Sequence, residues 1–500
     1  PLARPWEFDD AIDAAVIAVA RDTFGVSLEP YTRPYLVRST QLSGFGRFDW
    51  QLANDNHLSV RAGIGSIPSP GADTQLGAAV VPGMLVEGSD LMISSTLGSM
   101  FRRTWAHEIR LGVVRTTRDY GVGAPAEPDE LPATRIVSGG LRFGTDPRFP
   151  GRFDRTNFTT AQSLEIPASR HRIKLGLETD LESHKEDYAY ARDGAFVFGG
   201  PGDFGTSTGS FFQTSGASEA SYSVFRLGGF IQDTWEATPE LLVVVGVRAD
   251  FTSLPGDEVS RNEQWLTYTG VANDSIPSST FGLSPRLGLT WALGSDRSWI
   301  VRASAGSYEN ALDPAVLSEI VTADGDRTIR RGVGDLDSWP GAPTTTSATE
   351  LALLGPKFRS PRTNRFSLGL SRPLGLTTRL HVSGTYRHTD FLPRRADLNL
   401  FTSPTAHDQH GRPIFGTLVK AGSVIGALAT SRRFSDFDRV SALNTDGWSR
   451  YLGLTATVER NAGANTALFA SYTYSRTTDN WLSGGAAGAD GQLTPFPEEG

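Results

Sequence analysis

Cysteine is absent from the 500 residues, which excludes disulfide frameworks, thiolate metal sites and a cysteine nucleophile. Long apolar runs are missing as well. The longest are Leu241 to Val247 and Ala14 to Ala20, whereas a helix needs about 20 apolar residues to cross a bilayer. The second run follows Asp9, Asp10 and Asp13 rather than basic residues, so it predicts a short helix and not a signal peptide.

A basic surface and a catalytic motif are also missing. The net charge is −8 and no Lys/Arg run occurs, so we expect no nucleic-acid partner. No nucleophile, base and orienting group occur together in a recognisable local motif, so we expect neither an enzyme nor a cofactor site. His407-Asp408-Gln409-His410 has the spacing of metal ligands, but no second cluster lies near it in the sequence, so no metal site is predicted.

Alternating apolar and polar residues are abundant. From Phe281 to Leu293 every second residue is apolar, and those between are small or polar. A period of two is that of a β-strand with one apolar face. About fourteen segments show it, near 35–53, 56–67, 89–97, 104–118, 152–166, 170–187, 222–236, 241–254, 280–293, 297–309, 362–374, 378–392, 448–461 and 465–479.

The connections between these segments alternate between very short and very long. The short ones are 54–56, the stretch near Gly98-Ser99, 167–169, 237–239, 294–296, 375–377 and 462–464. The long ones are 68–88, 119–151, 188–221, 255–279, 310–361 and 393–447. Outer-membrane barrels have short periplasmic turns and long extracellular loops, and strands of about 9 to 11 residues suffice to span. The pattern therefore predicts an all-β, transmembrane, antiparallel up-and-down barrel.

Aromatic residues on the apolar parity predict a girdle at each membrane interface. Phe225 and Trp235 lie ten residues apart, as do Phe281 and Trp291, and ten tilted strand residues rise roughly 26 Å, close to an apolar band of about 25 Å. The alternative is that they are core or edge residues of a soluble β protein. The predicted periplasmic girdle holds Trp105, Trp235, Trp291 and Trp299, and the outer girdle holds Phe225, Phe281, Tyr472 and Tyr474.

Four arginines lie on the polar parity and are predicted to face the lumen: Arg226, Arg248, Arg286 and Arg302. Three roles remain open for them, namely lining a solute path, pairing with acidic groups of a plug, and forming a solvated wall. Asp233 lies on the apolar parity, but close to a short turn, where a lipid-facing charge costs little.

Several motifs resemble those of one family. GGFIQDTWEATPELLVVVGVRADF, from Gly228 to Phe251, resembles the hairpin of TonB-dependent receptors in which an IQDTW strand leads through a Thr-Pro turn into a GVR strand. LSPRLGLTW from Leu283 and VRASAGSYEN from Val301 resemble the adjoining pair of strands. The segments SPRTNRFSLGLSRPL, YRHTDFLPRRADLNL and ASYTYSRTTDNW, which begin at residues 360, 386 and 470, are similar to the Oar-like branch of that family.

The resemblance implies a barrel of 22 strands whose lumen is plugged, in the outer membrane of a Gram-negative bacterium. About fourteen strands are found, no plug domain or coupling box is recognised, and no final strand ends in an aromatic residue. We therefore expect a fragment of a longer chain, with residues 1–34 forming a short helix and loop before the barrel strands and residues 35–500 forming the barrel segment. An open sheet of this size is not expected to be a stable barrel alone.

The same resemblance implies an energised importer of siderophores, cobalamin, glycans or peptides. Its implied partners are outer-membrane lipid, a solute, and the inner-membrane TonB complex, which would be reached through the missing N-terminal part. Two alternatives stay open. A passive porin or export barrel would lack a plug altogether, and a soluble or surface-anchored β-rich adhesin would need no detergent.

Overall fold

The computed structural model describes most of the chain. It covers residues 10–28, 40–66, 84–122, 150–295, 297–310, 314–336, 343–355, 357–407, 432–461 and 466–480, together with the short pieces 2–3, 35–36, 69–70, 134–137, 142–144, 312, 341, 411, 413–416, 418–419, 428–429 and 463.

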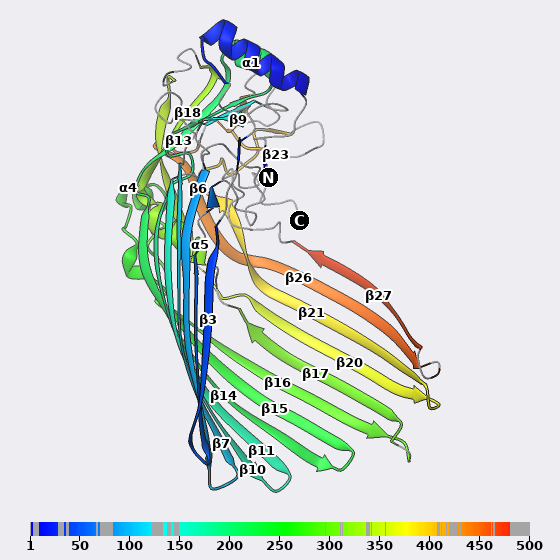
Figure 1. Cartoon of the computed structure of the whole chain (residues 1–500). Helices are drawn as coiled ribbons and strands as arrows, with labels where there is room; N and C mark the ends of the chain where they lie inside the picture. The colour runs from blue at the N-terminus through cyan, green and yellow to red at the C-terminus, as the bar shows by residue number, and fades with distance from the viewer. Residues whose placement is uncertain are drawn as a thin grey trace.

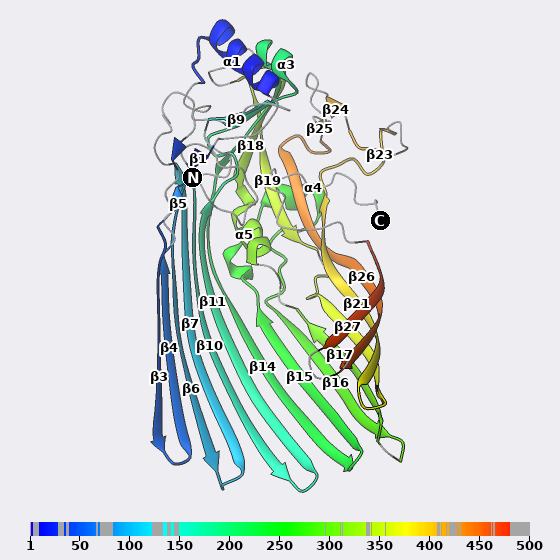
Figure 2. The same ribbon diagram turned by 45° about the vertical axis from the view of Figure 1, so that its right-hand side comes forward.

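Fourteen long strands form one curved antiparallel sheet in the order of the chain (Figures 1 and 2). They are β3 (Leu42–Ala53), β4 (Asn56–Ser66), β6 (Met84–Phe101), β7 (Trp105–Val122), β10 (Gly151–Ala168), β11 (His171–Tyr188), β14 (Glu219–Thr238), β15 (Leu241–Ser253), β16 (Ser279–Leu293), β17 (Trp299–Glu309), β20 (Arg362–Leu374), β21 (Thr378–Asp397), β26 (Phe437–Asn461) and β27 (Ala467–Asp479). Each pairs with the next one named. The predicted up-and-down fold is confirmed, and each predicted segment overlaps one strand.

The sheet is open within the described part of the chain. β3 pairs on one side with β4, and β27 pairs on one side with β26, but no residue pairing joins β3 to β27. Figure 2 shows these two strands at opposite edges of the curve. The structure is therefore a barrel wall with two free edges.

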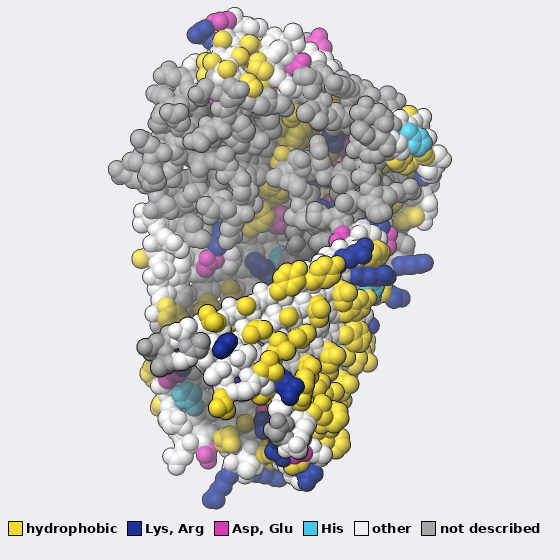
Figure 3. All heavy atoms as spheres, turned by 90° about the vertical axis from the view of Figure 1, so that its right-hand side faces the viewer, with side chains coloured by type: hydrophobic (Ala, Val, Ile, Leu, Met, Phe, Trp, Pro, Cys, Tyr) yellow, Lys and Arg dark blue, Asp and Glu magenta, His cyan; other side chains and the backbone are white. Residues whose placement is uncertain are grey.

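The strand registers keep one parity on one face across the whole sheet. Phe281 lies opposite Phe251, and Val247 lies opposite both Ile231 and Pro285. The outer face is consequently a continuous apolar surface, seen in part as a broad band of hydrophobic side chains in Figure 3. Soluble monomers rarely expose contiguous apolar patches above a few hundred Å², so this surface is suited to lipid. No described helix is long and apolar enough to span a bilayer.

The short turns all lie at one end of the sheet. The turn predicted near Gly98-Ser99 is wrong, because β6 continues to Phe101 and the chain reverses at residues 102–104. Arg102 and Arg103 take positive φ values of 48° and 63° there. Two adjacent arginines in the left-handed region are uncommon, which is why a prediction that looked for glycine placed the turn too early.

The long connections at the other end contain further elements, which together we call the loop layer. These are β8 (Thr134–Val137), β9 (Arg142–Phe143), β12 (Ala195–Phe198), α3 (Pro201–Gly205), β13 (Thr208–Gly216), η2 (Gly256–Glu258), α4 (Glu263–Thr269), α5 (Pro314–Thr322), β18 (Asp324–Asp335) and β19 (Thr346–Leu354). The prediction of plain loops over 310–361 and 393–447 is thus wrong in part, since 310–361 contains α5, β18 and β19 and 393–447 contains the first eleven residues of β26.

A second set of strand pairings runs through the loop layer. β8, β12, β13, β18 and β19 pair in that order, and β19 joins the upper end of β26 in parallel. β26 therefore belongs to both sets of pairings. Its first half pairs with β19 and its second half with β27. The loop layer is in this way continuous with the barrel wall.

Helix α1 (Asp10–Phe24) lies at the tip of the loop layer (Figure 1). Its Val16 and Ala20 are fully buried in a cluster with Phe196, Phe204 and Phe211. This is the helix predicted from the Ala14 to Ala20 run. The remaining strands are two-residue pieces: β1 (Leu2–Ala3), β2 (Tyr35–Leu36), β5 (Ser69–Pro70), β22 (Ala406–His407), β23 (Pro413–Ile414), β24 (Leu418–Val419) and β25 (Leu428–Ala429).

Candidate functional site

The inner face of the sheet carries the four predicted lumen arginines, and two of them, on β14 and β15, pair with carboxylates. Arg226 of β14 lies 2.9 Å from Asp180 and 2.8 Å from Glu182 of β11. Arg248 of β15 pairs in the same way with Glu178 and with its own neighbour Asp250. These two arginines are therefore neutralised by the wall itself, a pairing that the sequence analysis did not consider.

Glu182 is the centre of this paired region. Its side chain is fully buried, and besides Arg226 it forms an ion pair with Arg155 of β10 and contacts His184, whose Nε2 lies 2.9 Å from a carboxylate oxygen. The His184 ring stacks on Tyr222 of β14 with centroids 5.0 Å apart. Three strands thus converge on one carboxylate, and the alternation of residues along a single strand could not reveal this.

Helix α5 lies inside the curve of the sheet (Figures 1 and 2). Leu317 and Ile320 of α5 are buried in a cluster with Tyr222 and Val224, which lie on the inner face of β14. The Tyr222 hydroxyl is 3.1 Å from the Ser318 hydroxyl of α5. The segment between β17 and β20 therefore folds inward and occupies the upper lumen.

Beneath α5 lies a cavity of about 370 Å³. Its walls carry the Arg226 and Arg248 ion pairs together with Glu309 of β17, and Leu312 and Phe358 of the apolar α5 cluster also line it. The cavity is thus charged on the strand side and apolar on the loop-layer side.

Ion pairs of low exposure join the loop layer to the wall. Arg331 of β18 pairs with Asp438 of β26 at 2.6 Å, and Arg395 of β21 pairs with Glu319 of α5. Arg439 of β26 also pairs with Glu350 of β19, Arg432 pairs with Asp397 of β21, and Arg327 of β18 pairs with Glu350 within the loop layer. Breaking a buried pair leaves an uncompensated charge, at a cost of about 3–5 kcal/mol. The ion pairs and the apolar cluster together hold the loop layer in place.

The inner face of β16, β17, β20 and β21 differs in charge at the middle of the wall. Arg286, Arg365 and Arg387 lie on one transverse row across β16, β20 and β21, with Gly306 of β17 between the first two. We call these three arginines the basic row. Neighbouring strands are about 4.8 Å apart, and like charges directly opposite each other are destabilising. Arg365 and Arg387 are in that position.

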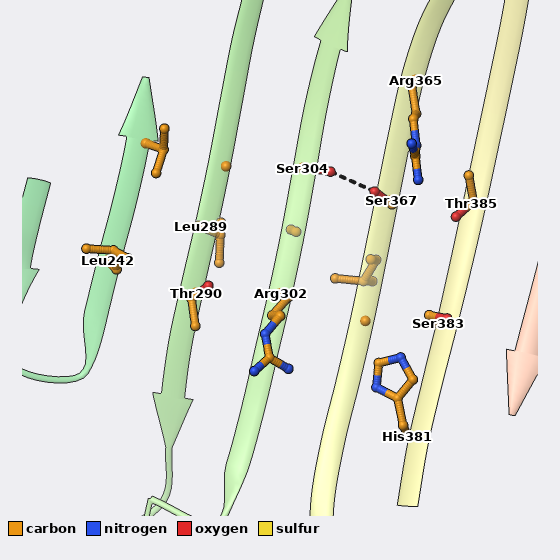
Figure 4. Close-up of a pocket in the computed structure, with 15 residues that line it drawn as sticks. Leu242, Leu289, Thr290, Arg302, Ser304, Arg365, Ser367, His381, Ser383 and Thr385 are labelled. Atoms are coloured by element: carbon orange, nitrogen blue, oxygen red, sulfur yellow. Dashed lines mark hydrogen bonds between the residues drawn. The ribbon is translucent and has the colours of Figure 1, made fainter. Parts of the chain in front are cut away.

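A cavity of about 460 Å³ extends from the basic row toward the short turns. Figure 4 shows Arg365 of β20 near its upper end, and Arg302 of β17 and His381 of β21 in its lower half, on the two strands that flank β20. The Ser304 and Ser367 hydroxyls are 2.6 Å apart across it, and the His381 Nδ1 is 2.8 Å from the Ser371 hydroxyl. The residues lining this cavity include no carboxylate.

All eight predicted girdle residues lie on the outward parity. Trp235, Trp291, Trp105 and Trp299 lie within three residues of the short-turn ends of their strands, and Phe281 is two residues inside the long-loop end of β16. Tyr472 and Tyr474 lie in the middle of β27 rather than near its long-loop end, because β27 continues to Asp479. Phe225 lies six residues inside β14 for the same reason.

The outward-facing Asp233 has a partner. His171 Nδ1 lies 2.7 Å from its carboxylate, and the His171 ring stacks on Trp235 with an interplanar angle of 4°. The lipid-facing carboxylate of Asp233 is therefore hydrogen-bonded to a neighbouring side chain at the short-turn end.

The described residues contain no group of three or more potential metal ligands. Of the histidine motif considered in the sequence, His407 is exposed in β22, and residues 408–410 lie outside the described residues. Arg365 and Arg387 were not among the predicted site residues, although the alternation along β20 and β21 places both on the inner parity.

Comparison with known proteins identifies the architecture. The chain matches the family model described as an outer membrane beta barrel domain over residues 20–499. No curated protein matches it. Three solved structures share the fold. The outer membrane transporter YddB from Escherichia coli has 10% identity and a TM-score of 0.56, with 89% of this chain and 49% of that chain covered.

The copper transporter OprC has 11% identity and a TM-score of 0.52, with 90% and 56% covered. The FrpB iron transporter from Neisseria meningitidis has 10% identity and a TM-score of 0.51, with 89% and 54% covered. The chain thus spans about half the length of the solved proteins that it matches.

Proposed function

The chain belongs to the outer-membrane β-barrel domain family, and from this we propose that it forms part of the wall of an energised solute importer. The protein is located in the outer membrane. In the proposed role it captures a solute from outside at the loop layer, passes it along the lumen and catalyses no reaction. Energy would come from the inner-membrane TonB complex, which acts through a segment N-terminal to this wall.

One observation carries the proposal: the loop layer occupies the upper lumen instead of leaving it open. Helix α5 is buried against β14 and tied to β21 by an ion pair. A passive porin keeps an aqueous channel through its barrel. A lumen that is filled in this way supports gated passage. The three related structures, of an outer membrane transporter, a copper transporter and an iron transporter, agree with it.

The proposal also fixes the orientation of the wall. In bacterial barrels short turns face the periplasm and long loops face outside. The loop layer would then meet the solute first, and the inner face of the wall would meet it later. The solute itself is unassigned among siderophores, glycans, peptides and similar molecules.

Uptake by cells that express the full-length protein tests the proposal. Cells with and without the gene are given a panel of labelled solutes, before and after a protonophore collapses the inner-membrane proton gradient. An importer shows gene-dependent uptake that stops on collapse. Gene-dependent uptake that persists would point instead to a passive pore, and a protein found in the soluble fraction without detergent would point to an adhesin.

A further inference from the structure

We propose that the inner face of β16, β17, β20 and β21 is a binding site for anionic solutes that carry carboxylate or phosphate groups. The inference deepens the proposed function and rests on it, because the site lies on the path that the solute would follow. The site offers a row of exposed guanidinium groups, with hydroxyl groups in the cavity beside them.

The positive charge of the arginines on this face is not compensated by the wall. None of Arg286, Arg302, Arg365 and Arg387 forms an ion pair with any described carboxylate, and the side chains of all four are exposed. On the neighbouring strands β14 and β15, by contrast, each of Arg226 and Arg248 contacts two carboxylates. Acidic residues outnumber basic ones in the chain, 55 to 47, so the unpaired arginines do not reflect a shortage of acids.

Two of these arginines are positioned by aromatic rings and not by carboxylates. Arg286 lies over the Tyr308 ring at 4.7 Å, and Arg387 lies over the Tyr451 ring at 4.8 Å. Stacking on an aromatic face positions a guanidinium without neutralising it, and its N–H edge stays available for an oxyanion. Between them Arg365 has neither a ring nor an acid as partner among the described residues. Placing it opposite Arg387 is unfavourable until an anion lies between them.

The cavity beside the row offers both space and hydrogen-bond donors to a solute. The cavity of about 460 Å³ below the row is lined by Gly288 and Gly369. Because these residues have no side chains, the cavity is deeper there. Hydroxyl groups of Ser304, Ser367 and Thr385 also line it, and they can donate to oxyanions. Carboxylates and phosphates share this chemistry. Lipid headgroups are unsuited as the source, because the site lies on the face opposite to the apolar outer surface.

The test is anion binding to the full-length protein, purified from outer membranes in an uncharged detergent. Calorimetry at low salt measures citrate and inorganic phosphate separately, with glycerol as the neutral control. Binding of citrate alone would assign polycarboxylates, and binding of phosphate alone would assign phosphorylated solutes. We expect at least one to bind, and the affinity to fall as salt is raised, since exposed charges are screened.

Variants then locate the site. Arg365→Gln or Arg387→Gln should weaken binding about threefold and the double variant about tenfold, as for exposed charge pairs. The matched control is Arg379→Gln, on the same face of β21, because Arg379 already lies 3.9 Å from Glu459; it should change the affinity less than about twofold. A boiling-dependent gel shift shows that each variant is folded.

Two results would overturn the site. One is equal binding by the wild type and the double variant. The other is no binding of either anion by the wild type, together with a lower heat-modification temperature for the double variant, which would assign the arginines to carboxylates of another protein segment. Loss of gene-dependent uptake with anion binding intact would remove the transport proposal alone. Intact uptake without anion binding would remove the site alone.

Discussion

The buried Glu182 carboxylate shows how much of this wall depends on single charges. Glu182→Gln would leave Arg155 and His184 without the charge that they face, while Arg226 keeps Asp180. We expect a loss of about 3 kcal/mol in the free energy of unfolding, at the low end for a broken buried pair because Arg155 is half exposed. The temperature at which the folded gel band disappears measures it.

The control for Glu182 is Glu165→Gln, on the inner face of the neighbouring strand β10. Glu165 is 39% exposed and lies 3.6 Å from Arg172, so it is a surface pair and its loss should cost less than about 1 kcal/mol. Equal losses in the two variants would show that water reaches Glu182 and that the burial described above does not hold in detergent.

Among the elements, helix α5 is the one whose position closes the upper lumen. Leu317→Asp puts a charge into the apolar cluster that holds α5 against β14, where burial of the leucine contributes about 1.5–3 kcal/mol. We expect α5 to detach while the strands stay paired. Cells should then become several-fold more sensitive to a large antibiotic such as vancomycin, and the purified protein should conduct in planar bilayers.

Val271→Asp is the matched control for α5, since it introduces the same charge at an exposed apolar residue of the segment between β15 and β16. It should leave both antibiotic sensitivity and conductance unchanged. If Leu317→Asp also changes neither, α5 does not close the lumen, and the observation that carries the transport proposal fails.

The elements also show what the sequence could and could not predict. Strands such as β16 face lipid on one side and water on the other, so their side chains alternate and the pattern of two is visible. Strand β19 is covered on both faces at its end, from Glu350 to Leu354, and therefore shows a continuous buried run instead of alternation. Alternation therefore predicts a loop there, and it predicts one at the upper part of β26 for the same reason.

The candidate site was predictable only in part, for a related reason. Parity along one strand placed Arg226 and Arg248 on the inner face, but their partners come from other strands, and those depend on register. Register also creates the basic row, since Arg365 and Arg387 are 22 positions apart and become neighbours only when β20 pairs with β21. Alternation gives the face of a residue, and pairing gives its neighbours.

At the scale of the whole molecule, the two free edges decide whether this wall can exist alone. β3 has 12 residues and β27 has 13, and about half the backbone groups of an edge strand point outward, which gives roughly 12 unpaired groups on each edge. At about 2 kcal/mol or more for each group in lipid, the total is several times the 5–15 kcal/mol by which proteins are stable. The edges therefore require partner strands.

Because of this cost, the full-length protein and residues 1–500 alone should migrate differently on a gel. The full-length protein, extracted from outer membranes in detergent, should migrate faster unboiled than boiled, because its barrel is closed. Residues 1–500 produced alone should show no such shift and should aggregate through β3 and β27. A shift for residues 1–500 alone would mean that β3 and β27 pair with each other and that fourteen strands form a narrower, self-sufficient barrel. The open curve in Figure 2 would then not be the state of this wall in a membrane.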